Sequence, residues 1–303
     1  MDIGLLLIAT AQTGDLAALA RRAEEVGFES LWIPDHPVIP IKIATPFPLG
    51  SGLPEHYGRW VDPFVALTVA AAATTRLKLV TGICLLPERQ PLLTAKVVAS
   101  LDHYSRGRVI LGVGAGWLRE ETEVMGTAFG SRWQRLRETV EALRVLWREA
   151  EASYEGKLVR FPAVRCEPKP VQVGGPPILL GGHGPKVYPR LAQTYDGWCP
   201  IIDDPGTFAR EVAELRAVLQ GAGRDPDAFQ LSPFVDPQDG NLSRDRLKAY
   251  RDAGGREWCS SRKRPPPRWQ TGEPRSGSSG PPRSSSELDG CSAAPAAGTT
   301  AVL

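Results

Sequence analysis

Long apolar runs are absent from this 303-residue sequence. An apolar stretch near the start, residues 3–9, is far too short to span a membrane, which takes about 20 residues. Asp2 precedes it, so the basic region that opens a signal peptide is missing. We therefore expect no membrane partner and interpret residues 3–9 as a buried strand.

Cysteine and excess charge are also scarce. The five cysteines lie far apart and include no C-x-x-C pair, so neither a metal site nor a disulfide framework is predicted. A reducing cytoplasm is the simplest compartment for such a chain. The formal net charge is +2 and no Lys/Arg cluster occurs in the first 250 residues, so a nucleic-acid partner is not predicted either.

Short apolar runs do alternate regularly with amphipathic stretches. Near-continuous apolar strands that alternate with helices indicate a parallel sheet covered on both faces. Seven strand–helix units are more than a doubly wound sheet usually needs, so we predict an α/β fold, a (β/α)8 TIM-type barrel with insertions. The predicted strands are residues 3–9, 30–33, 77–84, 108–113, 178–180, 196–201 and 229–235. The predicted helices are residues 15–26, 63–74, 91–104, 132–150, 186–195, 207–219 and 242–253.

Three connections are unusually long. Residues 34–62 follow the second strand and residues 114–131 follow the fourth, so both leave the C-terminal ends of their strands. Active sites of such barrels are built on that face, and long loops there usually serve function. Residues 151–177 precede the fifth strand and carry a predicted hairpin at 153–161.

The sequence changes character after residue 254, where an eighth strand and helix should follow. Ser, Pro and Gly make up about half of residues 255–303, and apolar periodicity vanishes. A segment of this composition buries too little apolar surface to offset its ordering entropy. We therefore divide the chain into a barrel of seven β/α units, residues 1–254, and a disordered tail, residues 255–303, with no normal strand 8 or helix 8. A natural tail is one explanation, and a reading-frame shift near Gly254 is the one we favour.

Candidate site residues gather at the ends of the predicted strands. Asp35 and His36 directly follow the second strand, where barrels place ligand-contacting groups. A histidine there can hydrogen-bond a ring carbonyl or move a proton, whereas a loop histidine that caps backbone is the alternative. Gly82 interrupts the third strand, which indicates a bulge, a close approach to a ligand, or tight packing inside the barrel.

Glycines follow the fourth and fifth strands as well. Gly114 and Gly116 end the fourth strand, where small residues let a flat ring approach the backbone. Glu120 and Glu121 come next, and we interpret them as a solvated helix face rather than as catalytic acids. The turn at 181–184 (GGHG) precedes a predicted helix, whose free N–H groups and dipole suit a phosphate; an ordinary glycine-rich turn is the alternative.

Taken together, these segments resemble the luciferase-like monooxygenase superfamily, in particular its branch that depends on the deazaflavin coenzyme F420. The matching segments are AEEVGFESLWIPDH, TGICLLPERQPLLTAKVVASLDHYSRGRVILGVGAGW, YEGKLVRF with CEPKPVQ, and PPILLGGHGPKVYPRLAQTYDGW. The resemblance covers residues 1–254, and GRVILGVGAGW and DGW are its most specific parts.

The resemblance implies an eight-stranded barrel with the cofactor at its C-terminal mouth. The tricyclic ring would lie against a strand-three bulge with a non-prolyl cis peptide, here Gly82-Ile83. The cofactor phosphate would lie on the glycine turn, here Gly181 and Gly182. The remaining residues that we expect at the cofactor are Asp35, Gly114, Ala115 and Gly116.

His36 matches a histidine that acts on the substrate in deazaflavin dehydrogenases of the family. A glutamate after the fourth strand acts with it in those relatives, and Trp117 occupies that position here. A tryptophan cannot accept a proton at neutral pH, so the resemblance does not extend to a sugar-phosphate dehydrogenase.

The sequence thus favours an oxidoreductase that transfers a hydride between F420 and a small organic substrate of unknown identity. An FMN-dependent monooxygenase that uses oxygen is the alternative on the same scaffold. A third hypothesis is a truncated, catalytically impaired chain, because a barrel without its eighth strand has two unpaired edges. Relatives are commonly dimers, so the resemblance leaves a homodimer open.

Overall fold

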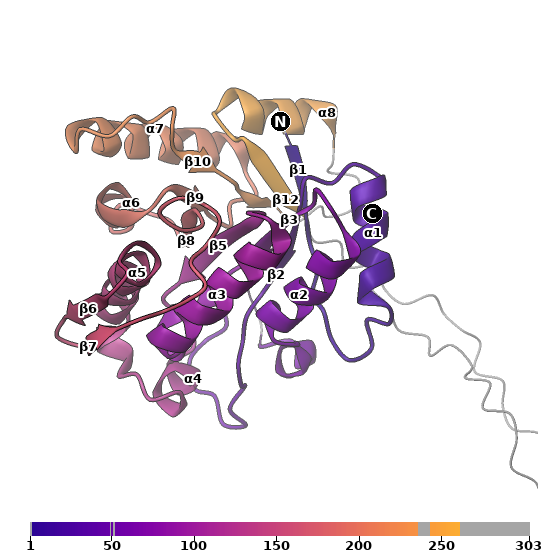
Figure 1. Cartoon of the computed structure of the whole chain (residues 1–303). Coiled ribbons are helices and arrows are strands. Elements are labelled where there is room, and N and C mark those ends of the chain that lie inside the picture. Colours follow the sequence, from indigo (N-terminus) through magenta and orange to yellow (C-terminus); the bar gives the residue numbers. More distant parts are fainter. Residues whose placement is uncertain (1, 49, 51, 236–242, 261–303) are drawn as a thin grey trace, which may run out of the picture.

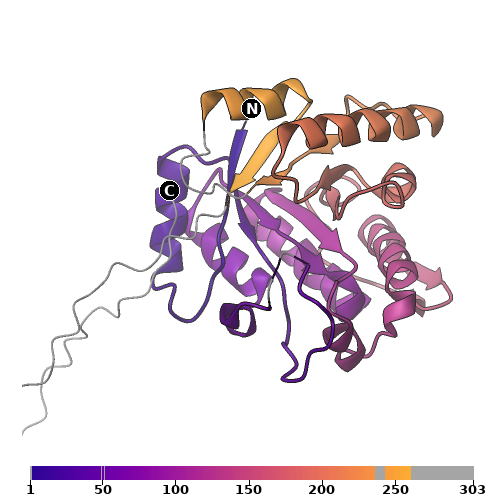
Figure 2. The same ribbon diagram turned by 180° about the vertical axis from the view of Figure 1, so that it is seen from behind.

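The computed structural model describes residues 2–48, 50, 52–235 and 243–260. Its centre is a curled sheet of parallel strands, and helices cover the outside of this sheet (Figures 1 and 2). The strands of the sheet are β1 (Asp2–Leu6), β2 (Ser30–Ile33), β3 (Lys78–Thr81), β4 (Cys84–Leu85), β5 (Val109–Gly114), β8 (Ile178–Gly181), β9 (Gly197–Cys199), β10 (Gln230–Leu231), β11 (Phe234–Val235) and β12 (Glu257–Ser260). The helices are α1 (Leu16–Glu25), α2 (Pro63–Ala73), α3 (Pro91–Ser105), α4 (Arg119–Val124), α5 (Arg132–Arg148), α6 (Tyr188–Thr194), α7 (Pro205–Gly221) and α8 (Arg244–Asp252).

The predicted α/β barrel class is confirmed, and each predicted strand and helix has a counterpart within a few residues of its expected bounds. Short 3-10 helices occur in the long loops, at η1 (Glu55–Arg59), η2 (Leu86–Glu88) and η3 (Phe129–Ser131). The predicted hairpin is also confirmed, as the antiparallel pair β6 (Ala152–Glu155) and β7 (Arg160–Val164).

Helix starts are set by side chains placed directly before them. Asp62 accepts hydrogen bonds from the N–H groups of Phe64 and Val65 at 2.8 and 3.2 Å, and Pro63 opens α2. Such a cap satisfies N–H groups that have no partner within the helix. Helix α2 therefore begins as soon as the long loop after β2 ends, and its first turn lines the same cavity as His36.

The sheet closes on itself through a split strand. Only Ser232 and Pro233 separate β10 from β11, yet β10 pairs with β9 whereas β11 pairs with β12. The N–H of Phe234 also donates to the carbonyl of Pro200 at 2.7 Å, which joins β11 to the segment after β9. β10 and β11, the two ends of the strand order, are halves of one split strand and occupy one position. β3 and β4 likewise share one position beside β5, so the ten strands fill eight positions of a closed barrel.

Strand eight is present but short. The four residues of β12 pair in parallel with β1, from Asp2 opposite Glu257 to Leu5 opposite Ser260, and β12 pairs with β11 on its other side. The predicted barrel boundary at residue 254 is therefore corrected, because the barrel extends to Ser260. This strand cannot be recognised from the average composition of residues 255–303. Its pairing depends on backbone hydrogen bonds, whose partners are supplied by the neighbouring strands β1 and β11. The rest of the predicted disordered, frame-shifted tail, residues 261–303, lies outside the described residues, as does any position for helix 8.

Polar partners on β2 accommodate the acidic residue of β12. The buried Glu257 carboxyl accepts a hydrogen bond from the hydroxyl of Ser30, which itself accepts one from the indole N–H of Trp32 at 2.6 Å. Burial raises the pKa of Glu257, and the hydrogen bond from Ser30 opposes that rise. Hydrogen bonding thus offsets the cost of placing a carboxyl inside the barrel.

Two apolar clusters form the core. The larger one fills the space between the sheet and the helices and includes Leu31, Leu111 and Leu143. The smaller one lies inside the barrel, and Ile83 packs on it from the C-terminal end of β3. Its buried members are Trp32, Val80, Ile110, Leu179, Cys199, Phe234 and Cys259.

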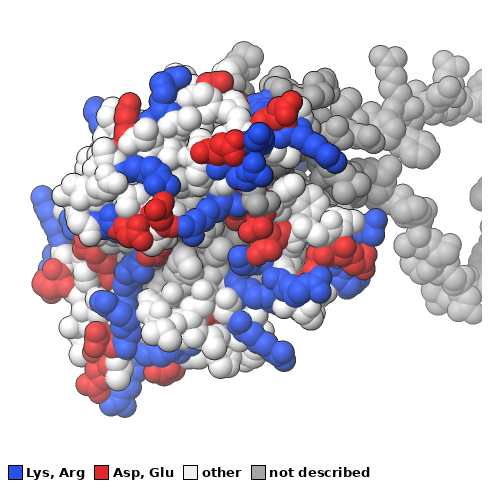
Figure 3. Space-filling view, turned by 90° about the horizontal axis from the view of Figure 1, so that it is seen from above, with Lys and Arg blue, Asp and Glu red and all other residues white. Residues whose placement is uncertain are grey.

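The outer surface gives little indication of a partner on the face that Figure 3 shows. There, Lys and Arg side chains are interspersed with Asp and Glu side chains, so this face presents no continuous basic surface. No helix in the described part of the chain is long and apolar enough to cross a membrane.

Candidate active site at the barrel mouth

The third strand breaks at the predicted bulge. Strand β3 ends at Thr81, β4 resumes at Cys84, and both pair with β5. The peptide between Gly82 and Ile83 is cis, as the family resemblance implies. A Cβ on Gly82 would lie 3.1 Å from the side chain of Trp32, so glycine lets the chain pass directly over the inner core. The bulge therefore rests on the inner core and faces the mouth.

The side chain of Ile83 fills the space that two neighbouring glycines leave open. A Cβ on Gly114 or Gly181 would lie 2.4 or 2.5 Å from Cδ1 of Ile83. These glycines therefore accommodate Ile83, so that Ile83 forms the floor of the mouth instead of their bare backbone. Ala115 is buried beside them, and Gly116 adopts a positive φ of 79° at the rim.

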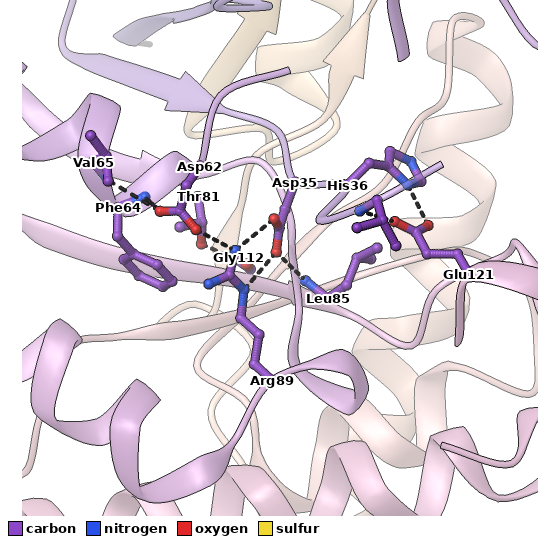
Figure 4. A network of polar contacts seen from close by, with 11 residues as sticks. Asp35, His36, Asp62, Phe64, Val65, Thr81, Leu85, Arg89, Gly112 and Glu121 are labelled. Carbon is purple, nitrogen blue, oxygen red and sulfur yellow. Dashed lines mark hydrogen bonds and ion pairs between the residues drawn. The ribbon is translucent and has the colours of Figure 1, made fainter. Parts of the chain in front are cut away.

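The carboxylate of Asp35 is hydrogen-bonded to other residues of the protein below the mouth (Figure 4). Its carboxylate accepts hydrogen bonds from Nη2 and Nε of Arg89 at 2.7 and 2.9 Å and from the N–H of Leu85 at 3.1 Å. Asp62 shares the same guanidinium at 2.8 Å. Burial lowers the pKa of Arg89, but the hydrogen bonds to Asp35 outweigh burial and hold that pKa above its usual value. Asp35 thus fixes the chain just after the bulge, and any effect on a cofactor would be indirect.

His36 is paired with a buried carboxylate. Its Nδ1 lies 2.6 Å from Oε2 of Glu121, and the two side chains are 6% and 0% exposed (Figure 4). A carboxylate at this distance fixes the orientation of the imidazole ring. Three aromatic rings enclose the imidazole, at centroid distances of 5.3, 5.1 and 6.1 Å for Tyr57, Trp60 and Trp117.

The prediction of a solvated acidic face at the start of α4 is wrong for Glu121, whereas Glu120 is partly exposed and holds a loop. Glu121 is fully buried against His36, and Glu120 accepts hydrogen bonds from the Thr45 hydroxyl and from the N–H groups of Ala44 and Thr45 at 2.7, 2.8 and 3.1 Å. These hydrogen bonds, that of the Thr45 hydroxyl first, hold the pKa of Glu120 at about 2. Helix α4 thereby holds the long loop after β2 in place. The partners lie 75 to 85 residues apart, so no local pattern reveals them.

The glycine turn after β8 differs from the predicted anion site. The turn itself is confirmed, with φ of 93° and 91° at Gly182 and Gly184, and the indole of Trp198 donates to the Gly182 carbonyl at 2.7 Å. The N–H of Gly184, however, already donates to the carboxylate of Glu211 at 3.2 Å. Helix α6 begins only at Tyr188 and has seven residues, so a helix dipole does not add to the turn as predicted.

Arg132 lies at the rim of the mouth, and the sequence-based prediction missed it. Its Nε donates to the carbonyl of Gly116 at 3.1 Å, and its guanidinium lies 3.6 Å from the ring centre of Phe129, on which Arg119 also stacks at 4.4 Å. Burial lowers the pKa of Arg132, and the charges of Arg119 and Arg190 lower it further. No acidic partner of Arg132 is found among the described residues, so this rim suits an anion.

A cavity of 360 Å³ opens beside the mouth, between the first turns of α2 and α3 and the end of α4. Its volume falls within the range of small-molecule sites. His36 and Asp35 line it together with Glu88, a buried acid at the end of η2. Elsewhere in the described ranges, too, no cluster of His, Cys, Asp and Glu is arranged to hold a metal ion.

Comparison with known families decides the relationship. The family model described as Luciferase-like monooxygenase matches residues 3–261. The chain belongs to the luciferase-like monooxygenase family. This match runs to the end of β12, in agreement with the corrected boundary of the barrel.

The chain is similar to the following three proteins. An uncharacterised protein of Mycobacterium tuberculosis is 39% identical over 234 residues, which cover 74% of this chain and 80% of that protein. A 5,10-methylenetetrahydromethanopterin reductase of Archaeoglobus fulgidus is 28% identical over 249 residues, which cover 82% of this chain and 67% of that enzyme. The structure of the coenzyme F420 dependent tetrahydromethanopterin reductase of Methanopyrus kandleri shares the fold, with a TM-score of 0.68, 20% identity and coverage of 86% and 93%.

Proposed function

We propose that this luciferase-like protein is an F420-dependent oxidoreductase that transfers a hydride between the deazaflavin and a small organic molecule. The observation that carries the proposal is the buried contact between His36 and Glu121 at the mouth. Reduction of a carbonyl or oxidation of an alcohol moves a proton as well as a hydride, and a histidine oriented by a carboxylate suits that task. The F420-dependent and methanopterin-linked reductases among the similar proteins support the choice of cofactor.

The residues at the mouth fit such a cofactor. Ile83 offers an apolar floor for a flat ring, because its side chain lies over the backbone of Gly114 and Gly181. Arg132 would hold an anionic part of the cofactor, with the backbone of Gly181 and Gly182 as the second support. When bound, the deazaflavin supplies or accepts the hydride, and the protein positions and protects it.

The chain's own residues would manage the proton. Glu121 engages Nδ1 of His36, which leaves Nε2 of the imidazole to exchange a proton with the substrate oxygen. Trp117 stands where the family pattern has a glutamate, and Glu121, four residues later, provides the carboxylate instead. Trp117, Tyr57 and Trp60 shield this pair from water, which strengthens its electrostatic interaction.

Equilibrium titration of the purified chain with F420 and with FMN tests the proposal. We expect saturable binding of F420, and at least tenfold weaker binding by Arg132→Gln, which removes the charge at the rim. Gly130→Ala is a matched control, because a Cβ at Gly130 meets nothing within 4 Å and the residue lies in η3, directly before the helix that Arg132 opens. Binding of FMN without binding of F420 would overturn the proposal in favour of an oxygen-dependent FMN monooxygenase, the reaction class for which the family is named.

We further propose a homodimer, because exposed apolar side chains recur at helical spacing on two neighbouring helices. Val65 and Val69 lie on α2, and Leu93 and Val97 lie on α3. Contiguous exposed apolar surface of this kind commonly marks an interface. Light scattering of the purified chain should give twice the monomer mass, and Val97→Lys should reduce it to the monomer mass. The four described cysteines are unpaired and buried, which fits the cytoplasmic location that we also propose.

The closed barrel argues against the hypothesis of an impaired, truncated chain, because β12 covers both edges that an absent eighth strand would expose. We therefore expect the 303-residue chain to unfold in a single cooperative thermal transition. The proposed reading-frame shift would now start beyond Ser260, and the three-frame translation of the coding sequence tests it.

A further inference from the structure

Glu88 is a buried acid that the proposed mechanism leaves unused. It ends η2, just after the strand-three bulge, and is only 4% exposed. Its Oε1 accepts a hydrogen bond from the hydroxyl of Thr122 at 2.9 Å. Its Oε2 is buried and has no hydrogen-bond partner within the described residues. The residue Glu88 also lines the cavity that His36 lines. A buried carboxylate with one unused oxygen is costly unless it carries a proton.

Glu88 lies directly beneath the rim of the mouth. A Cβ on Gly116 would lie 3.1 Å from Oε1 of Glu88 and 3.3 Å from the hydroxyl of Thr122. The positive-φ turn at Gly116 therefore packs closely against this pair. Glu121, the partner of His36, directly precedes Thr122 on α4. One short helix thus places the Glu88–Thr122 pair next to the His36–Glu121 pair.

The charged groups around Glu88 come from several elements, and they include Arg135 on α5, whose Nε donates to the carbonyl of Pro87 at 3.1 Å. Glu121 on α4 and Asp35 after β2 are negative, and both disfavour a second carboxylate. Arg89, next in sequence, is positive but is shared by Asp35 and Asp62. Burial, then Glu121 and Asp35, raise the pKa of Glu88 to about 8, against the opposing effects of the Thr122 hydrogen bond and Arg89. Two carboxyl groups in one dry site generally share a single charge.

We propose that Glu88 is a positioning residue that holds a proton beside Glu121 and thereby sets the charge around the His36–Glu121 pair. In neutral solution Glu88 is an uncharged acid, and Glu121 is the only carboxylate that faces His36 from α4. In alkaline solution Glu88 loses its proton, and a second negative charge appears beneath the rim. The effect of this change on catalysis rests on the proposed function of His36. The protonation state of Glu88 does not depend on that function.

Infrared spectroscopy of the full, cofactor-free chain tests the proposal directly, because a protonated carboxyl has a C=O band that a carboxylate lacks. We expect a component of this band in neutral solution that is lost with a midpoint of about 8 and is absent from Glu88→Gln. Any signal from Glu257, the buried acid of β12 whose pKa is also raised, should be the same in both proteins. Glutamine keeps an acceptor for the Thr122 hydroxyl, so the variant should retain the fold. Glu123→Gln is the matched control, since Glu123 is exposed on α4, the helix of Thr122, and pairs with Arg119.

Two further variants should move the midpoint in opposite directions. Glu121→Gln removes the neighbouring charge and should lower it, whereas Thr122→Val removes the hydrogen bond to the carboxylate and should raise it. The link to His36 is read from its imidazole resonances in ¹⁵N NMR, which should respond at the same midpoint in the wild type and not in Glu88→Gln. The chain has four histidines, so assignment by substitution is practical.

Three results would overturn the proposal: no protonated carboxyl band in neutral solution, identical bands in the wild type and Glu88→Gln, or His36 resonances that do not change at the transition. A failure of F420 to bind would overturn the proposed function and leave these spectra unchanged. The experiments therefore test the proposed function and the proposed role of Glu88 independently.

Discussion

Replacing Glu88 by glutamine should change how the stability of the protein depends on pH. The raised pKa of Glu88, about 8 against the ordinary 4.5, means that the folded chain binds one more proton than the unfolded chain between these values. The free energy of unfolding must therefore fall as pH rises through this window, and be flat with respect to Glu88 outside it. At about 1.36 kcal/mol per pKa unit, Glu88 should cost about 2–3 kcal/mol between pH 5.5 and 8.5.

Urea unfolding of the wild type and Glu88→Gln at both pH values measures this cost. The difference between the two proteins isolates Glu88, because all other groups titrate in both. We expect Glu88→Gln to gain about 2–3 kcal/mol relative to the wild type between the two pH values, and Glu123→Gln to gain nothing. Parallel pH dependences of the wild type and Glu88→Gln would refute the reasoning, since they would mean that Glu88 is ionised throughout.

Three further changes follow from packing and ion pairing. Asp35→Ala should destabilise the chain by about 2–4 kcal/mol in urea unfolding, because it leaves the half-buried Arg89 with only Asp62; a loss below 0.5 kcal/mol would contradict the role given to this pair. Gly112→Ala should cost about 1–3 kcal/mol by the same assay, since its Cβ would lie 2.2 Å from the backbone carbonyl of Thr81, and a neutral effect would show that β3 and β5 are less closely packed. A chain that ends at residue 256 should lose its cooperative thermal transition, whereas one that ends at residue 260 should keep it; equal behaviour would mean that β12 does not close the barrel.

The barrel could be predicted because its signal is local and repeated. Each apolar run and each amphipathic stretch can be recognised on its own, and their strict alternation restricts the topology to a parallel sheet. The cis peptide at Gly82-Ile83 followed from family resemblance, since a glycine within a strand is compatible with several local structures. Strand β12 could not be predicted, because four residues within a polar segment carry too little pattern, and its neighbours β1 and β11 lie far away in sequence.

The chemistry of the site depended on contacts that sequence does not display. His36 was identified from its place after β2, but its partner Glu121 lies 85 residues away and looked like a surface acid. Arg132 and Glu88 were missed for the same reason. What distinguishes them from other charged residues is their burial and their lack of oppositely charged partners among the described residues, and neither property produces a periodic pattern in the sequence. At the glycine turn, the sequence suggested free N–H groups, but the N–H of Gly184 donates to Glu211. The expected role of Gly181 and Gly182 at the cofactor phosphate stays a prediction.

The most direct test of the account is where F420 binds. Hydrogen exchange measured by mass spectrometry, with and without the cofactor, locates the contact on the chain. We expect F420 to slow exchange at the bulge (residues 82–83), at the end of β5 (residues 114–116) and at the glycine turn (residues 181–182), and to leave the hairpin β6–β7 unchanged. Protection of these three segments by FMN and not by F420, or protection confined to other segments, would contradict the account.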